Sequence, residues 1–256
     1  MKRVLVIGIG AGDPDHVTLQ AVAALNATDV FLVLDKGEAT EDMVALRKEI
    51  CARHITGDSY RIVEAADPAR DLSGPSYRTA VAQWHAQRVQ LYEHLLADEV
   101  AEHEVAAILA WGDPALYDST MRILDEVRAR GNVAFDYEVV PGISSVQVLA
   151  ARHRIPLHAV GRPVHITTGR RLTAGWPDGA DQVVIMIDGK GAFHDYVDRD
   201  LEIFWGAYLG TPDEILLSGP LHEMADEITR VRAEARARKG WLFDTYLLRP
   251  PVAPRS

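Results

Sequence analysis

The 256-residue chain has one cysteine and no long apolar run. A single cysteine, Cys51, excludes an internal disulfide and any metal site built from several cysteines. No apolar stretch reaches the roughly 18 residues of a membrane-spanning helix, so we expect no membrane span. The sequence enters a strand-like pattern within its first residues, without signal-peptide features. We therefore expect a protein of the reducing cytoplasm.

Several catalytic motifs are also missing. The chain has no Walker lysine, which argues against hydrolysis of nucleoside triphosphates, and no Gly-x-Ser-x-Gly nucleophile elbow. Its histidines form no His-x-x-x-His pattern, so we expect no metal. The glycine-rich loops that remain are typical of a binding site for a small molecule.

Acidic residues are unevenly distributed. The formal net charge of −10 argues against nucleic acid as a partner. No acidic residue lies between Glu138 and Asp178, although this stretch contains several basic side chains. Such a segment favours an anionic ligand, because guanidinium groups pair with carboxylates. The alternative is a solvated surface that lacks acids by chance. The candidates for binding an anionic substrate are Arg152, Arg154, His165 and Arg170, together with Asp35 at the end of an apolar run.

Three glycine-bearing peptides follow apolar runs that are typical of buried strands. Because the carboxyl ends of parallel strands form the ligand-binding edge of an α/β sheet, we expect the three peptides to form one site. Asp13 suits a helix N-cap, and Pro14 suits the first helical turn. The peptides are Gly8–Pro14, Trp111–Tyr117 and Val140–Ser145, after the predicted strands Val4–Ile7, Val105–Ala110 and Phe135–Val140.

A dinucleotide-binding fold is an alternative explanation of the first peptide. Gly8, Gly10 and Gly12 follow a strand, and Asp35 ends the next apolar run. The fingerprint requires a glycine where this chain has Asp13, whose carboxylate would repel a pyrophosphate. The sequence therefore disfavours NAD or FAD.

Alternating strands and helices predict an α/β fold. We expect a mostly parallel N-terminal sheet with flanking helices over residues 1–145, and a smaller α/β domain with a mixed sheet over residues 146–256. Residues 55–75 are predicted to form a long loop, and the tail from Arg249 a loose end. The other predicted strands are 30–34, 164–167, 183–188, 215–218 and 246–248, and the predicted helices are 42–53, 77–96, 119–130, 191–201 and 221–238.

The three peptides, with a methionine that ends the run Val183–Met186, resemble the tetrapyrrole methylases, the class III S-adenosylmethionine-dependent methyltransferases. The resemblance spans nearly the whole chain. It implies a bilobal fold with S-adenosylmethionine in the cleft between the domains, and S-adenosylhomocysteine as a product. Ala11 departs from the proline that many relatives have between the second and third glycines. The cofactor contacts implied are Ala11, Trp111, Gly112, Asp113, Leu116, Tyr117, Ser144, Ser145, Met186, Gly206 and Ala207.

Within the family, the segments 33–38, 110–118 and 204–213 most resemble the branch of cobalamin biosynthesis that methylates precorrin-5 at C1 and releases acetate. The substrate implied is an anionic tetrapyrrole, and relatives are often homodimers. Acetate release requires an activated water, for which Asp113 and Tyr117 are the candidate catalytic residues, with Asp35 and His165 also considered. The alternatives are another tetrapyrrole C-methyltransferase, a protein methylase resembling diphthine synthase, and a module that binds S-adenosylmethionine without turnover.

Overall fold

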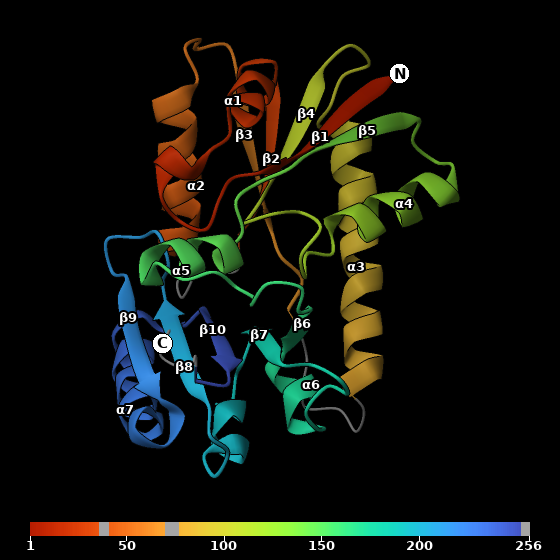
Figure 1. Ribbon diagram of the computed structural model, residues 1–256. Coiled ribbons are helices and arrows are strands. Elements are labelled where there is room, and N and C mark those ends of the chain that lie inside the picture. The colour runs from red at the N-terminus through yellow and green to blue at the C-terminus, as the bar shows by residue number, and fades with distance from the viewer. Residues whose placement is uncertain (36–40, 70–76, 252–256) are drawn as a thin grey trace. The chain divides into compact units, whose positions relative to one another are not determined.

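The computed structural model describes residues 1–35, 41–69 and 77–251 of the chain (Figure 1). Residue contacts divide it into two compact units, Met1–Ser144 and Ser145–Ser256, called unit 1 and unit 2 below. Parts of three predicted features lie outside the described residues: positions 36–38 of the family-like segment, the end of the loop predicted at 55–75, and the tail from 252 onward.

Unit 1 contains a five-stranded parallel sheet, as the sequence predicts. Its strands run in the order β3-β2-β4-β1-β5, so β4 lies between β2 and β1. The strands are β1 (Lys2–Gly8), β2 (Val30–Asp35), β3 (Arg61–Ala66), β4 (Val105–Ala110) and β5 (Phe135–Val140).

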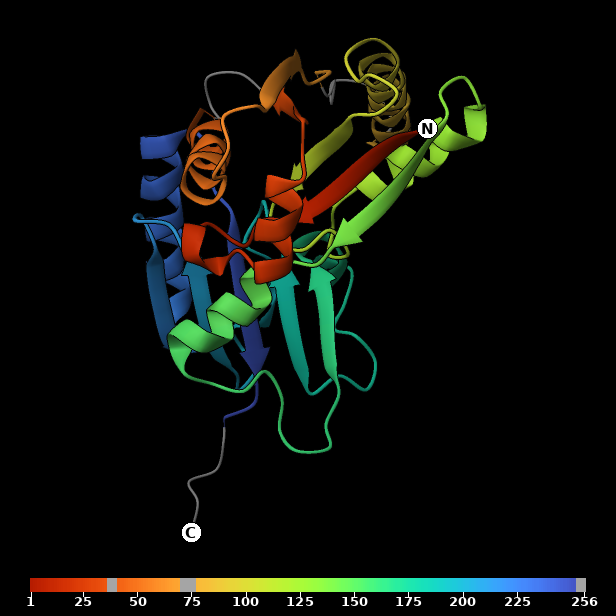
Figure 2. The same cartoon turned by 90° about the horizontal axis from the view of Figure 1, so that it is seen from above.

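Helices cover both faces of this sheet (Figure 1), and the view from above shows the same separation (Figure 2). Val4 and Val6 of β1 pack in the core that α3 and α4 cover, whereas Leu5 and Ile7 pack in the core that α1 and α2 cover. Two buried faces explain why the run is continuously apolar rather than alternating. The helices are α1 (Leu19–Asn26), α2 (Glu41–His54), α3 (Tyr77–Asp98) and α4 (Thr120–Arg130).

Cys51 belongs to the core beneath α2. Its side chain is buried, and burial raises the pKa of its thiol to about 11. A thiol that stays protonated is a poor nucleophile, so Cys51 acts as a small apolar core residue.

The prediction of an unbroken loop from 55 onward was wrong, because Arg61–Ala66 forms the edge strand β3. Its sequence carries Arg61 and Glu64, which are exposed, and no residue of the strand is fully buried. An edge strand with one open side lacks the apolar run by which the other strands were recognised.

The helix expected from Asp13 onward is divided in two. Asp13 caps a short 3-10 helix, Pro14–His16, by accepting a hydrogen bond from the Asp15 N–H at 2.9 Å. Val17 is extended, and Thr18 then caps α1 through the Ala21 N–H at 3.0 Å.

Unit 2 contains the predicted mixed sheet, with strand order β6-β7-β10-β8-β9. β6 and β7 are parallel, and the other neighbours are antiparallel. The strands are β6 (Val164–Thr168), β7 (Gln182–Met186), β8 (Glu202–Ala207), β9 (Ile215–Pro220) and β10 (Asp244–Arg249), and the helices are α5 (Ser145–His153), α6 (Gly169–Thr173) and α7 (Leu221–Lys239).

Two predictions in unit 2 need correction. The helix expected at 191–201 is only a 3-10 turn, Ala192–Tyr196, and β8 was not predicted. In β8, the side chains of Ile203, Trp205 and Ala207 belong to the core that α7 covers. The ring of Phe204 instead packs against the ring of His153 on α5, with the ring centroids 5.5 Å apart. The alternation was masked because both faces of β8 are covered.

A buried ionic network joins the end of β7 to α7 and β10. The Asp188 carboxylate accepts the N–H groups of Lys190, Gly191 and Ala192 at 3.0, 2.9 and 2.7 Å, and the Tyr246 hydroxyl at 2.7 Å. These bonds satisfy a buried charge and fix the segment that follows β7.

The second carboxylate of the network is Asp244. Its Oδ2 accepts the Trp205 Nε1–H at 2.9 Å and lies 3.2 Å from Arg232 Nε, while Arg232 also donates to the Asp188 carbonyl oxygen. Burial raises the pKa of Asp244 from 3.8 to about 6, because desolvation of the carboxylate outweighs the opposing effects of the Arg232 guanidinium and the Trp205 hydrogen bond.

The carboxyl ends of β1, β4 and β5 meet in unit 1 through glycine backbones. A Cβ on Gly142 would lie 2.1 Å from the Gly112 carbonyl oxygen and 2.8 Å from Gly8 Cα. A Cβ on Gly8 would lie 2.7 Å from Gly142 Cα. Gly8 and Gly142 therefore exclude a side chain, whereas Gly112 contributes its carbonyl oxygen to the contact and has a φ of +70°, which favours glycine. The loops after the three strands are held in backbone contact.

We expect Gly142→Ala to destabilise unit 1 by about 3 kcal/mol, the upper end of the range for overpacking, because the obstructing atoms are backbone. Urea unfolding would measure the change. Gly57→Ala is the control, since the nearest atom to its Cβ is the Ser59 Oγ at 4.0 Å. Equal stability of the two variants would contradict the tight packing.

A second expectation concerns pH. The pKa of Asp244 is raised on folding, so its contribution to stability is complete below about pH 3.8 and is lost as the pH rises through about 6. The Asp244→Asn variant keeps an acceptor for Trp205 but no longer titrates at this position. Relative to that variant, the free energy of unfolding of the unmodified protein should fall by on the order of 1 to 3 kcal/mol between about pH 3.8 and about pH 6. Urea unfolding at several pH values would measure it, with the exposed Asp226→Asn as control. A difference independent of pH would refute the assignment.

Candidate functional site

The first candidate region lies at the glycine-bearing loops of unit 1, which we call loop 1 (9–13), loop 2 (111–117) and loop 3 (141–144). Loops 1 and 2 pair as a short antiparallel bridge. The Gly112 N–H donates to the Gly10 carbonyl oxygen at 2.8 Å, and the Gly10 N–H donates to that of Gly112 at 3.3 Å. The structure thus brings two of the predicted peptides together at the ends of neighbouring strands.

Asp113 joins loop 2 to loop 3. Its Oδ2 accepts the Gly142 N–H at 2.9 Å, and its Oδ1 accepts the Ala115 N–H at 2.8 Å. Each carboxylate oxygen is therefore used to hold backbone. This geometry gives Asp113 a structural task at the site, in addition to any contact with a ligand.

The remaining candidates of unit 1 differ in burial. Ala11 and Ser144 are buried, and a Cβ on Gly112 would lie 3.6 Å from Ser144 Cα. Trp111 and Leu116 are half-buried. Tyr117 is 45% exposed and has a φ of +55°, a left-handed conformation unusual for an aromatic residue. Strained backbone of this kind is concentrated at binding sites.

The candidates of unit 2 gather around a residue that sequence analysis missed, Thr245 of β10. Thr245 pairs with Met186 of β7 on one side and Gly206 of β8 on the other. Its hydroxyl lies 2.8 Å from the Ser145 hydroxyl at the start of α5. Three predicted contact residues from separate segments therefore surround one threonine, which no motif identifies.

Ala207 and the residue after Met186 complete this group. Ala207 is buried and pairs with Asp244. Ile187 is 57% exposed with a φ of +54°, and the Asp188 network follows directly. An exposed apolar side chain on a strained but firmly anchored backbone is suited to contact a ligand.

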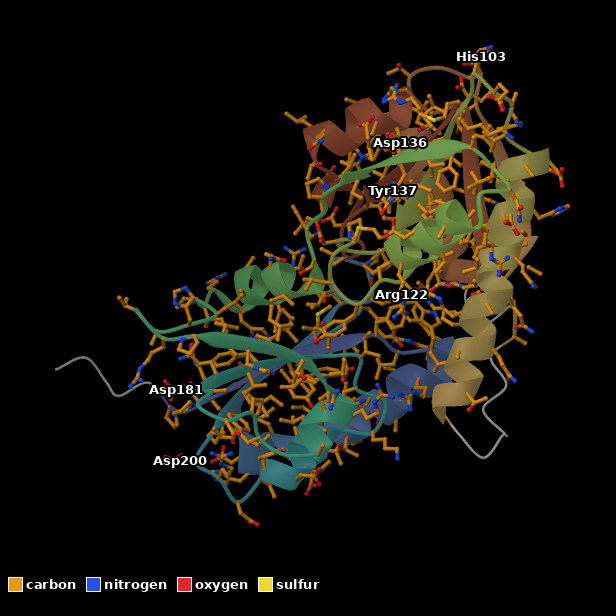
Figure 3. All side chains as sticks on the ribbon, turned by 90° about the vertical axis from the view of Figure 1, so that its right-hand side faces the viewer. His103, Arg122, Asp136, Tyr137, Asp181 and Asp200 are labelled. Atoms are coloured by element: carbon orange, nitrogen blue, oxygen red, sulfur yellow. The ribbon has the colours of Figure 1, made fainter. Side chains whose placement is uncertain are left out.

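Two arginines of the segment without acidic residues, 139–177, pair with carboxylates from other parts of unit 2. Arg152 Nε lies 3.0 Å from Glu214, and Arg162 lies 3.3 Å from Asp181, which is labelled in Figure 3. Arg154 is exposed, with a φ of +56°. Because Glu214 directly precedes β9, its ion pair with Arg152 connects α5 to the loop before that strand.

The other substrate candidates occupy separate elements. His165 lies on β6 and Arg170 on α6, and both are exposed. Asp35 ends β2 in unit 1 and is half-buried. Sequence analysis also missed a group of arginines in unit 1, on α2, α3 and α4, because charged residues on helices give no sign of their common neighbourhood.

The described loops offer backbone groups, hydroxyls and apolar side chains to a ligand. Among the residues that the structure describes, no three His, Cys, Asp or Glu side chains are placed to hold a metal ion. In the same residues no helix is long and apolar enough to span a membrane. The backbone groups, hydroxyls and apolar side chains of the loops suit a small organic ligand that is recognised largely by backbone.

Comparison with known proteins assigns the family. The model of the tetrapyrrole (corrin/porphyrin) methylases matches residues 3–225. The precorrin-6A synthase [deacetylating] of a Sinorhizobium species is 51% identical over 249 residues, covering 97% of this chain and 95% of the relative.

Solved structures agree in fold. A putative cobalamin synthesis related protein from Corynebacterium diphtheriae has a TM-score of 0.84 at 36% identity, covering 97% of this chain and 98% of its own. A uroporphyrin-III C-methyltransferase from Thermus thermophilus, complexed with S-adenosylhomocysteine, has a TM-score of 0.60 at 21% identity, covering 96% and 97%. With the ordered motifs and the fold of both units in agreement, the chain belongs to the tetrapyrrole methylases.

Proposed function

We propose that this protein is a methyltransferase of cobalamin biosynthesis that transfers a methyl group from S-adenosylmethionine to C1 of precorrin-5 and releases acetate, giving precorrin-6A. The observation that carries the proposal is 51% identity, over nearly the whole of both chains, to a precorrin-6A synthase that is itself described as deacetylating. Matches to methylases of other tetrapyrrole positions are more distant, at 24–28% identity.

The described residues fit S-adenosylmethionine. Because Gly8 and Gly142 lack a Cβ, the loops after β1, β4 and β5 pack backbone against backbone, which brings the predicted cofactor contacts of unit 1 close together. In unit 2, the hydroxyls of Ser145 and Thr245 lie beside Met186 and Gly206. Contact of the cofactor with these residues, and with Ala11, Trp111, Leu116, Tyr117, Ser144 and Ala207, is our prediction.

S-adenosylmethionine supplies an electrophilic methyl group when bound. The protein must then hold the nucleophilic carbon of the substrate in line with that methyl group, and most of the rate enhancement can come from this alignment. Rigid loops serve this purpose, and Asp113 rigidifies loops 2 and 3 by accepting a backbone N–H from each. Methyl transfer itself needs no dedicated acid or base among these residues.

Release of acetate needs a group that directs water to the acetyl carbonyl carbon. Asp113 and Tyr117 remain the candidates. Both oxygens of Asp113 accept backbone N–H groups, whereas the side chain of Tyr117 is 45% exposed on a strained loop. These contacts favour Tyr117 as the residue that meets the substrate.

The remaining features of the proposal concern the substrate and its setting. Arg154, Arg170 and His165 are exposed and suited to bind carboxylates of a tetrapyrrole. Arg152 forms an ion pair with Glu214. An assembly as a homodimer and a location in the cytoplasm stay predictions.

The test is incubation of the protein with enzymatically generated precorrin-5 and methyl-labelled S-adenosylmethionine. We expect one labelled methyl group in the macrocycle by mass spectrometry, with an equimolar amount of acetate in the same reaction. Tyr117→Phe should lower acetate release by about 100-fold, the usual scale for a group that assists proton transfer, while binding of S-adenosylhomocysteine is retained.

Labelled product without acetate would contradict the deacetylating activity and indicate another tetrapyrrole C-methyltransferase. Binding of S-adenosylhomocysteine without any labelled product would leave the cofactor prediction standing and refute the substrate. Arg162→Gln, which changes an ion pair with Asp181 away from the predicted contacts, is a control that should keep full activity.

A further inference from the structure

Arg47, on α2, reaches the carboxyl end of β4 in unit 1. Its Nε donates to the Leu109 carbonyl oxygen at 3.4 Å, and its Nη1 donates to that of Met43 at 3.1 Å. Leu109 is the second-last residue of β4, two positions before loop 2 begins at Trp111. The guanidinium group therefore lies beside the candidate site, although α2 contributes no residue to the motifs.

The charge of Arg47 has no carboxylate partner within 4 Å among the residues that the structure describes. Arg47 is half-buried, and burial lowers the pKa of its guanidinium. A partly buried cation that is bound only to carbonyl oxygens is costly unless an anion approaches it. Asp118 is the acidic side chain whose field favours the charge, but its Oδ1 accepts the Thr120 N–H at 2.7 Å.

The neighbouring arginines of unit 1 are already engaged. Arg88 on α3 forms a two-pronged ion pair with Asp67 at 2.6 and 2.7 Å. Arg122 on α4, labelled in Figure 3, donates through Nε to His85 Nε2 at 3.0 Å. Their charges strengthen the positive potential, but their hydrogen-bonding groups have protein partners. Arg47 is the guanidinium of this group that lacks a side-chain partner in the described residues.

Tyr92, on α3, provides a second polar group beside Arg47. The residue is 3% exposed, and burial raises the pKa of its hydroxyl to about 12. The charges that act on this hydroxyl are those of Arg88, Asp118, Asp67 and Arg47, which places it in the same group. A phenolic hydroxyl in these surroundings is suited to donate a hydrogen bond to a ligand.

The sheet order explains why this point suits a ligand. β2 and β4 are neighbours, but the chain leaves β2 for α2 on one face and leaves β4 for α4 on the other. The carboxyl ends of strands at such a switch are where open α/β sheets bind their ligands. Arg47 reaches the end of β4 from the α2 face, and Tyr92 belongs to the core on the other face of the sheet.

We propose that Arg47 and Tyr92 form a carboxylate-binding site, in which the guanidinium group and the phenolic hydroxyl both donate to a carboxylate of one of the two reactants. The carboxylate belongs either to the tetrapyrrole substrate or to the amino-acid part of the cofactor, and both present the same chemistry. The inference deepens the proposed function and rests on it for the identity of the reactants.

The test measures binding rather than turnover, using Arg47→Met, Arg47→Lys and Tyr92→Phe. The probes are S-adenosylhomocysteine, methylthioadenosine, which has the same thioether and nucleoside but no carboxylate, and uroporphyrin III, a stable tetrapyrrole with carboxylate side chains. We expect Arg47→Met to weaken one carboxylate probe by about 10- to 100-fold, the range for a hydrogen bond to a charged group. Tyr92→Phe should weaken the same probe less, and Arg47→Lys should give an intermediate loss because it keeps the charge without the planar fork.

The probes distinguish the two sources of the carboxylate. Weaker binding of S-adenosylhomocysteine with unchanged methylthioadenosine assigns the site to the cofactor, and weaker binding of uroporphyrin alone assigns it to the substrate. Unchanged binding of both carboxylate probes overturns the proposal, whether or not the protein converts precorrin-5. Failure of the proposed function is recognised separately, as absence of labelled product from the unmodified protein.

Matched controls exclude general effects of the substitutions. Lys48→Met removes the next cation of α2, which pairs with Glu64 at 2.6 Å and is half exposed. Tyr137→Phe removes an exposed hydroxyl that donates to Asp125 at 2.9 Å; Tyr137 is also labelled in Figure 3. Both should bind all three probes as the unmodified protein does. If Arg47→Met does not fold by circular dichroism, Arg47→Lys and Tyr92→Phe decide the question.

Discussion

Contact between the backbones of Gly8, Gly112 and Gly142 is the constraint on which the site of unit 1 depends. Parallel strands bring their carboxyl ends to one edge, but side chains would keep the following loops apart. With no Cβ on Gly8 or Gly142, the loops after β1, β4 and β5 come into contact, and Asp113 joins two of them through Gly142. Backbone groups and the strained segment at Tyr117 are thereby presented where a ligand can reach them.

In unit 2, a buried ionic network fixes the segments that carry the candidate residues. The network of Asp188, Arg232 and Asp244 places two carboxylates around one guanidinium and satisfies them with backbone and aromatic donors. Buried charges of this kind contribute little net stability, but they restrict the arrangement of the elements that carry them. Here they hold the end of β7 and the middle of the sheet, where Met186 and Gly206 flank Thr245.

Secondary structure was predicted correctly from sequence where all residues of a segment have nearly the same environment. Strands such as β1 and β4 are buried on both faces, so their composition alone identifies them. It failed at β3, an edge strand with Arg61 and Glu64, and at β8, whose two faces pack against different helices. In both segments the partner strand, rather than the composition, determines the structure, and the partner is distant in sequence.

The sequence by itself determined the fold class, the order of the glycine loops and the resemblance to the methylases, because backbone conformation and burial restrict residue type locally. Only the tertiary structure decided which charges are compensated. The segment without acids meets Glu214 and Asp181 from elsewhere in unit 2, whereas Arg47 in unit 1 has no carboxylate partner among the described residues. Thr245 likewise gained its neighbours only through strand pairing. Electrostatic and cross-strand contacts depend on distance in space, which spacing along the chain does not encode.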